Sequence, residues 1–279
     1  MSRRAKQFWL AGRCLVAGYL LLITFGGCAD KLLLVPSTDH RDSGGASQKT
    51  IPLNNGVLEI WTARSAACAD HEPQAFLLEF CGNGTRAEDI ASYVAHRWDK
   101  HAIEVWAVNY PGFGGSTGAA KLTSIAPASL AAYDALAAVA NNRPIFTGGH
   151  SFGTAAALYI AAHRKTAGLF LHNPPALREL VMGHFGWWNL WLAAFPISLQ
   201  IPAELDSLRN AAHVKAPAVF ISALKDDWVP PRYHRMVIGA YAGPKRVIEL
   251  KTADHNSSLD TEKVAVEQAL DWLWSSQPR

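Results

Sequence analysis

A serine flanked by glycines lies where a predicted strand turns directly into a predicted helix, and this feature constrains the fold most. The apolar run 144–147 leads into Gly148-Gly149-His150-Ser151-Phe152-Gly153, and 154–160 is helix-forming. A turn this sharp strains the serine backbone, and Gly149 and Gly153 leave room that side chains would fill. The pattern predicts a hydroxyl presented at a strand end. G-x-S-x-G alone is weak evidence, so a nucleophilic Ser151 requires partners elsewhere.

A nucleophilic serine needs a base and an acid, which should follow it in the order Ser, Asp/Glu, His. Two late histidines compete for the role of base. His234 falls within 231–237, which reads as an exposed helical position, whereas His255 follows the strand-like run 246–250. A loop after a strand suits a base, so we predict His255. Asp226 follows the apolar strand 218–221 and is the predicted acid, with Asp227 as the alternative.

Three further motifs resemble signatures of the alpha/beta-hydrolase superfamily. They are Asp226-x-x-Val229-Pro230, Asn109-Tyr110-Pro111-Gly112-Phe113-Gly114 and Gly82-Asn83-Gly84. The pattern is similar to the branch grouped with serine aminopeptidase-like hydrolases, which also holds membrane-associated depalmitoylase-type enzymes. That branch usually has His-Gly-Asn after the strand before the first helix. Here Cys81-Gly82-Asn83 keeps the glycine turn but alters the surroundings of the oxyanion hole.

Alternation of predicted strands and helices indicates one α/β domain over residues 51–279 with a mostly parallel sheet, antiparallel only at its start, and helices on both faces. A chain of 279 residues that is 49% hydrophobic is long enough to bury the core of such a domain. The expected strands are 58–62, 75–80, 103–109, 144–148, 168–172, 218–222 and 247–250, and the expected helices lie near 129–140, 152–163 and 261–275. A capping box from Thr85 to Glu88 predicts one more helix.

A small cap is expected at about 173–214, between two of these strands. It contains Trp187, Trp188 and Trp191. These tryptophans could line an apolar acyl or aromatic pocket beside Ser151, or form a surface that touches lipid. A helical cap that simply packs on the domain is the alternative.

The first 27 residues are typical of a bacterial lipoprotein signal. Basic residues up to Arg13 precede an apolar run over 14–25, which is shorter than a membrane span, and Gly26-Gly27-Cys28 resembles a lipobox. Cys28 is therefore the predicted lipidation site, and residues 28–50 are the predicted tether. The expected location is the cell envelope, on a membrane facing the periplasm, with Ala29 favouring the outer membrane. An uncleaved N-terminal anchor and soluble secretion are the alternatives.

Charge and composition exclude several function classes. The formal net charge of +3 becomes −1 when the four cations Arg3, Arg4, Lys6 and Arg13 are removed with the leader. Nucleic-acid binding therefore has no support. The eleven histidines contain no H-E-x-x-H and no paired metal spacing, so no metal is expected. Cys68 and Cys81 are expected to be free, because a strand separates them by more than a disulfide can reach.

These residues predict acyl transfer through a covalent intermediate, without cofactor or metal. His255 would take the Ser151 proton, Asp226 would orient His255, and the N–H groups of Asn83 and Phe152 would form the oxyanion hole. The expected substrate is an ester or thioester of a small or acyl-containing molecule. A serine peptidase or amidase of the same fold, with Glu179 or Glu204 binding an amine, is one alternative. A non-catalytic membrane-tethered binding lipoprotein is the other.

Overall fold

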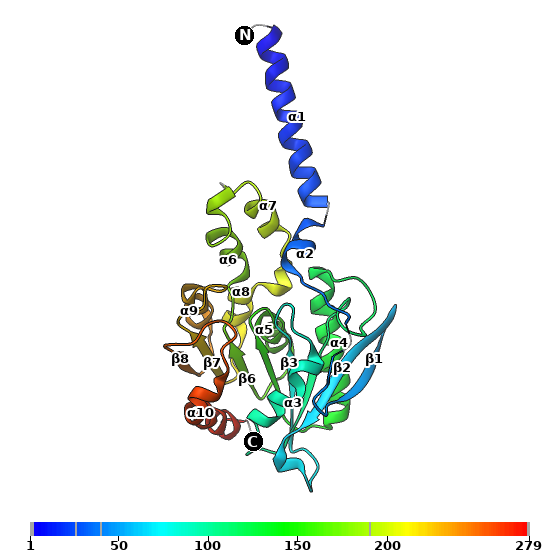
Figure 1. Ribbon diagram of the computed structural model, residues 1–279, viewed down its shortest axis with the longest axis vertical. Helices are drawn as coiled ribbons and strands as arrows, with labels where there is room; N and C mark the ends of the chain where they lie inside the picture. The colour runs from blue at the N-terminus through cyan, green and yellow to red at the C-terminus, as the bar shows by residue number, and fades with distance from the viewer. Residues whose placement is uncertain (1–2, 26, 40, 190, 278–279) are drawn as a thin grey trace.

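A computed structural model of the chain describes residues 3–25, 27–39, 41–189 and 191–277. In these residues eight strands form one sheet in the order β1-β2-β4-β3-β5-β6-β7-β8 (Figure 1). From β4 onward neighbouring strands are parallel, whereas β1–β2 and β2–β4 are antiparallel. The strands are β1 Ser47–Leu53, β2 Gly56–Arg64, β3 Ala75–Phe80, β4 Ile103–Val108, β5 Ile145–His150, β6 Gly168–His172, β7 Ala218–Ala223 and β8 Lys245–Leu250.

Helices cover both faces of the sheet. Buried apolar side chains of α3 and α10 pack on one face, and those of α4, α5, α8 and α9 pack on the other. The central strands β3, β5, β6 and β7 are buried on both faces, which explains their nearly continuous apolar runs. These helices are α3 Ala87–Arg97, α4 Leu122–Ala140, α5 Gly153–His163, α8 Ser207–His213, α9 Pro231–Ala240 and α10 Lys263–Ser275. The predicted mostly parallel sheet with helices on both faces is confirmed.

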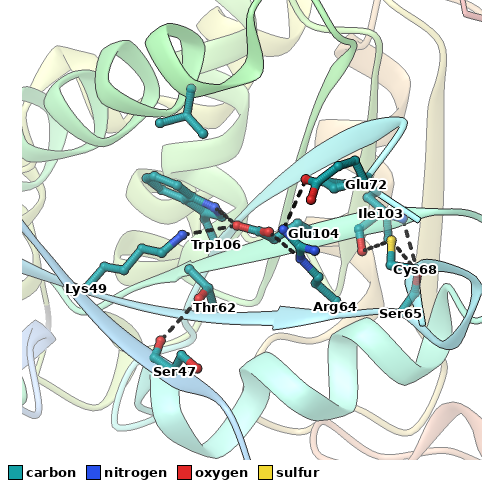
Figure 2. Close-up of polar contacts among 12 residues, drawn as sticks. Ser47, Lys49, Thr62, Arg64, Ser65, Cys68, Glu72, Ile103, Glu104 and Trp106 are labelled. Carbon is teal, nitrogen blue, oxygen red and sulfur yellow. Dashed lines mark hydrogen bonds and ion pairs between the residues drawn. The ribbon is translucent and has the colours of Figure 1, made fainter. Parts of the chain in front are cut away.

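The antiparallel edge of the sheet is held together by a buried carboxylate (Figure 2). Glu104 on β4 accepts hydrogen bonds from Arg64 Nε at 2.8 Å and Trp106 Nε1 at 2.8 Å, and its Oε1 lies 3.2 Å from Lys49 Nζ. Burial raises the pKa of Glu104, but these donors outweigh it and hold the pKa below its ordinary value. Glu104 thereby links three strands, β1, β2 and β4.

The predicted capping box at the start of α3 was misplaced. The N-cap of α3 is Arg86 rather than Thr85, and Asp89 rather than Glu88 accepts from the N-cap N–H. The reason is that Glu88 is buried, where it pairs with Arg86 and accepts from Asn109 Nδ2 at 2.9 Å. The box therefore shifts by one residue.

Cys68 and Cys81 are separate buried thiols.

The segment expected as a flexible tether, residues 28–50, is instead docked on the domain. Residues 28–33 form helix α2 (Cys28–Leu33), and β1 already begins at Ser47. Ala29 and Leu34 are buried, and Asp30 Oδ1 accepts from the N–H of Leu122 at 2.8 Å, at the start of α4. Polar residues in this stretch form hydrogen bonds with backbone groups of the domain. Because the sequence of the stretch resembles that of a linker, this docking could not be predicted from it.

An insertion that we call the cap lies between β6 and β7. It contains α6 (Leu177–Gly183), α7 (Ala194–Leu199) and α8, with short 3-10 turns between them. Figure 1 shows α6 and α7 on the side of the domain from which α1 (Arg3–Phe25) projects. Among the helices whose side chains are all described, α4 alone is long and apolar enough to cross a membrane, but 44% of its apolar window is buried. Its place on the sheet identifies α4 as a core helix.

Candidate active site

Ser151 occupies the strained turn between β5 and α5. Its φ is 51°, in the left-handed region that a residue with a side chain seldom adopts. Its N–H donates to His172 O at 2.8 Å, and Thr154 donates to its carbonyl from both N and Oγ1. A Cβ at residue 153 would lie 2.0 Å from Phe80 O, so only glycine fits there. The close approach of β3 thus requires Gly153, and the turn holds Ser151 at the carboxyl end of the sheet.

Asp226 and His255 meet at the same edge of the sheet. Asp226 Oδ2 lies 2.6 Å from His255 Nδ1, and Oδ1 accepts from the N–H groups of Trp228 at 3.0 Å and Val229 at 2.7 Å. Burial raises the pKa of Asp226, yet the nearby His234 ring and the hydrogen bonds from His255 and Val229 lower it below its ordinary value. An ionised Asp226 accepts a hydrogen bond from the Nδ1–H of His255, which leaves Nε2 of His255 as the basic nitrogen.

The prediction that His234 is exposed was wrong. Its side chain is fully buried, with Nε2 3.4 Å from Asp226 Oδ2 and Nδ1 2.9 Å from Ser222 Oγ. Burial lowers the pKa of His234, so the ring is neutral at neutral pH. Because Asp226 can only accept, the ring proton belongs on Nε2, and Nδ1 accepts from Ser222. The acid therefore lies between two histidines.

The backbone carbonyl of His255 is fixed by two donors. His150 Nε2 lies 3.0 Å from this oxygen and Asn173 Nδ2 lies 3.1 Å from it. Asn173 is anchored in turn, because its Oδ1 accepts from Ala223 N at 2.8 Å. Burial lowers the pKa of His150 to about 4, so His150 is neutral and donates through Nε2. The residue next to the serine therefore contacts the loop that carries His255.

Ser151 and His255 do not hydrogen-bond in the described structure, although His150, the residue before Ser151, contacts His255 directly. Nucleophile–base contacts are often long in a free enzyme and tighten when substrate binds. The hydrogen-bonded half of the site is the pair of His255 and Asp226.

The predicted oxyanion donors lie on neighbouring loops. Phe80 pairs with Gly149 across β3 and β5, so the turn with Asn83 lies beside the turn with Phe152. In the described part of the chain, neither residue's N–H donates a hydrogen bond. The Asn83 side chain points elsewhere, since Oδ1 accepts from Val35 N and Nδ2 donates to Leu33 O, both at 2.8 Å. Asn83 can therefore serve only through its backbone.

The motif around Asn109 joins the end of β4 to neighbouring elements. Asn109 Nδ2 donates to Glu59 Oε2 at 2.6 Å and to Glu88 Oε2, and Oδ1 accepts from Ala87 N at 2.8 Å. The end of β4 is thus joined to β2 and to the first turn of α3. A Cβ at Gly114 would lie 2.3 Å from Asn109 Nδ2, which explains the glycine. This motif positions the site without taking part in it.

A cavity of about 280 Å³ lies next to His255. Glu79, His150 and His172 reach it from three adjacent strands, and Arg97 reaches it from α3. Burial raises the pKa of Glu79 to about 7 against the attraction of Arg97. Glu79 Oε2 and His172 Nε2 have no hydrogen-bond partner among the described residues. Within the same described ranges, no group of three His, Cys, Asp or Glu side chains could hold a metal ion.

The cap tryptophans do not join this cavity. Trp187 and Trp188 are 68% and 67% exposed, and Trp191 is 47% exposed. The Trp191 indole donates to Met182 O at 3.0 Å, within the cap itself. The predicted acyl pocket beside Ser151 is therefore not formed by these side chains, because the turn that carries them lies at the outer end of the cap.

Sequence comparison places part of the chain near a known family. Residues 54–182 match the family described as alpha/beta hydrolase of unknown function (DUF1057). An uncharacterized protein of Mycobacterium tuberculosis, Rv2307c, is 29% identical over 157 residues, which is 55% of this chain and 53% of the relative. The chain thus matches about half the length of this curated relative.

Solved structures extend the likeness to most of the chain. The esterase Pf2001 of Pyrococcus furiosus has a TM-score of 0.66 at 15% identity, covering 88% of this chain and 96% of that one. Est1E of Butyrivibrio proteoclasticus has a TM-score of 0.65 at 13% identity, with 82% and 99% coverage. The acylaminoacyl peptidase of Pyrococcus horikoshii has a TM-score of 0.64 at 12% identity, covering 83% of this chain and 41% of that one. The strand order, the strained turn at Ser151 and these likenesses establish that the chain has the alpha/beta-hydrolase fold.

Proposed function

We propose that this protein is a serine hydrolase that cleaves an ester or thioester of a small or acyl-containing substrate. The observation that carries the proposal is the strained Ser151 at the end of β5, at the same edge of the sheet as a His255 that is hydrogen-bonded to an ionised Asp226. The fold and its esterase and peptidase neighbours support a hydrolase in general. The serine mechanism and the acyl substrate are our inference from the site.

The mechanism follows from which atoms carry protons. His255 Nε2 takes the Ser151 proton as Oγ attacks the carbonyl carbon, and Asp226 stabilises the imidazolium that results. The carbonyl oxygen becomes an anion that the N–H groups of Phe152 and Asn83 bind, each worth roughly 3 kcal/mol in the transition state. The tetrahedral intermediate expels the alcohol or thiol, which receives its proton from His255. Water repeats the sequence on the acyl-enzyme and releases the acid.

Esters and thioesters are favoured over amides on the evidence of the cap. A peptidase would need a carboxylate near the serine to bind an amine terminus. Glu204 is exposed, and in the described structure neither Glu179 nor Glu204 contacts Ser151, Asp226 or His255. From residue 180 to residue 203 the cap contains no Asp, Glu, Lys or Arg. This surface suits an acyl group better than a charged terminus.

We also propose that the protein is attached to a cell-envelope membrane and faces the periplasm. The leader and Cys28 support lipidation, and an uncleaved α1 would give the same attachment. Cys28 is partly exposed at the start of α2. Incorporation of an alkyne-tagged palmitate that is lost in Cys28→Ser tests lipidation, and retention of the label would contradict Cys28 as the site.

The proposed activity is tested with nitrophenyl esters of increasing acyl length. Wild-type protein should hydrolyse at least one ester, and Ser151→Ala should lower kcat/KM on the order of 10⁶-fold. Ser124→Ala is the matched control, because the Ser124 hydroxyl bonds only to Lys121 O at the start of α4. Faster cleavage of aminoacyl amides would favour the peptidase. Equal rates for wild type and Ser151→Ala on both substrate classes would overturn the serine hydrolase.

A further inference from the structure

The outer end of the cap presents large apolar side chains to solvent. Trp187, Trp188, Leu192 and Leu199 are each more than 60% exposed, and Phe195 is about half exposed. No Asp, Glu, Lys or Arg occurs between Glu179 and Glu204. Contiguous exposed apolar surface of this kind marks an interaction site. Tryptophans concentrated on it suit a membrane interface, where one end of the ring is apolar and the other is wet.

The place of membrane attachment lies directly beside this surface. α1 contacts α7, and the Tyr19 hydroxyl donates to Leu192 O at 2.9 Å. α2 contacts α7 as well, and Ala29 N lies 3.4 Å from Gln200 Oε1. Figure 1 shows the cap beside the end of α1 that is nearest the domain. Both the retained helix and a lipidated Cys28 would therefore enter the bilayer next to the cap.

The docked N-terminal segment holds the site of membrane attachment close to the domain. Asp30 bonds to Leu122 at the start of α4, and the Asn83 side chain bonds to the backbone on both sides of Leu34. Further along, Gly114 N donates to Ser37 O at 2.9 Å. A domain held at four points just after Cys28 cannot turn freely on its anchor. Its cap must face the membrane.

The depth of the contact fits an interfacial position. Tyr19 precedes the last residue of α1, Phe25, by six residues, which is about 9 Å along a helix. Leu192, bonded to Tyr19, therefore lies about that far beyond the base of α1. Interfacial elements insert their apolar faces roughly 5–10 Å into the boundary between headgroups and acyl chains.

We propose that the surface formed by Trp187, Trp188, Trp191, Leu192, Phe195 and Leu199 rests in the interfacial layer of a lipid bilayer. The proposal rests on the membrane attachment proposed above. Because the cap covers the carboxyl end of the sheet, this docking turns the side that holds Ser151 toward the bilayer. The substrate class then narrows to acyl esters or thioesters that reside in the membrane.

The experiment measures contact between these tryptophans and lipid. Full-length protein is reconstituted in phosphatidylcholine vesicles that contain phosphatidylcholine brominated at acyl carbons 6 and 7, and bromine quenching of tryptophan fluorescence is recorded. We expect Trp187→Phe/Trp188→Phe to lower the quenched intensity by about half, since it removes two of the four tryptophans at the bilayer and leaves Trp191 and Trp9 of α1. Trp272→Phe, on α10 at the far side of the domain, should leave it unchanged (Figure 1).

Three outcomes would overturn the proposal. Unchanged quenching in the double variant, with both proteins floating with the vesicles, would show that the cap does not touch lipid. The same result together with disulfide-linked dimers of Trp188→Cys would mean that a second copy covers the cap. Failure of the wild type to float would overturn membrane attachment and docking together. Hydrolysis of a soluble nitrophenyl ester in detergent, measured on the same samples, tests the proposed hydrolase activity independently of membrane docking.

Discussion

Two buried carboxylates near His255 have opposite surroundings. Asp226 is 2% exposed and accepts from His255 and from two backbone N–H groups, with His234 beside it. Glu79 is 3% exposed, and its Oε2 has no partner among the described residues. Burial raises the pKa of both, but donors reverse the effect only at Asp226. Burial alone therefore does not make a catalytic acid, because the number of hydrogen-bond donors decides whether the group stays charged.

Among substitutions that test this comparison of carboxylates, Asp226→Asn should have the largest effect. An amide cannot stabilise the imidazolium, and it can hold His255 in the wrong tautomer, so kcat/KM should fall about 10⁴-fold. Ester hydrolysis at neutral pH measures the loss. Asp227→Asn is the matched control, because Asp227 is exposed and adjacent in sequence. A larger loss in Asp227→Asn would transfer the role of acid to that residue.

Glu79→Gln should raise stability above neutral pH. The pKa of Glu79 is raised to about 7 in the folded protein from an ordinary value of 4.5, so folding favours the protonated acid. The protonated Glu79 contributes fully to the free energy of unfolding below pH 4.5, and this contribution is lost as the pH rises to 7. The loss amounts to about 3 kcal/mol. Chemical denaturation at pH 5 and pH 8 should show this decline in wild type and not in the variant. A parallel decline in Glu79→Gln would assign it to another group.

The sequence predicts the residues whose position follows from the end of a strand. Ser151, Asp226 and His255 each follow an apolar run, and parallel strands bring their carboxyl ends to one edge. His234 was misjudged although a signal existed, because His234, Val237 and Tyr241 recur at helical spacing on one buried stripe. The docking of Asp30 on Leu122 spans 92 residues and has no local pattern. The lack of a hydrogen-bond partner for Glu79 Oε2 among the described residues depends on packing in three dimensions, so it could not be predicted from the sequence either.

His234→Leu tests whether the second histidine makes Asp226 different from Glu79. Losing a donor to a buried carboxylate costs about 1.5–3 kcal/mol, so kcat/KM should fall about 10- to 100-fold. His234→Gln, which places an N–H donor near the same point, should restore most of the activity. Equal losses in both variants, with matching losses of thermal stability, would reduce His234 to a packing role.

Glu104→Gln is expected to have the smallest effect, and its sign should be opposite to that of Glu79→Gln. Three donors surround Glu104, and its pKa is lowered in the folded protein. The ionised Glu104 therefore stabilises the fold above its ordinary pKa of 4.5, and this stabilisation is lost as the pH falls through the lowered pKa of the folded protein. The variant should lose on the order of 1–2 kcal/mol at pH 7 and progressively less toward pH 3. Chemical denaturation of wild type and variant at pH 7, pH 5 and pH 3 measures it. Glu79→Gln and Glu104→Gln make the same chemical change in neighbouring strands. If both changed the free energy of unfolding in the same direction, the number of hydrogen-bond donors would not decide the charge of a buried carboxylate in this sheet.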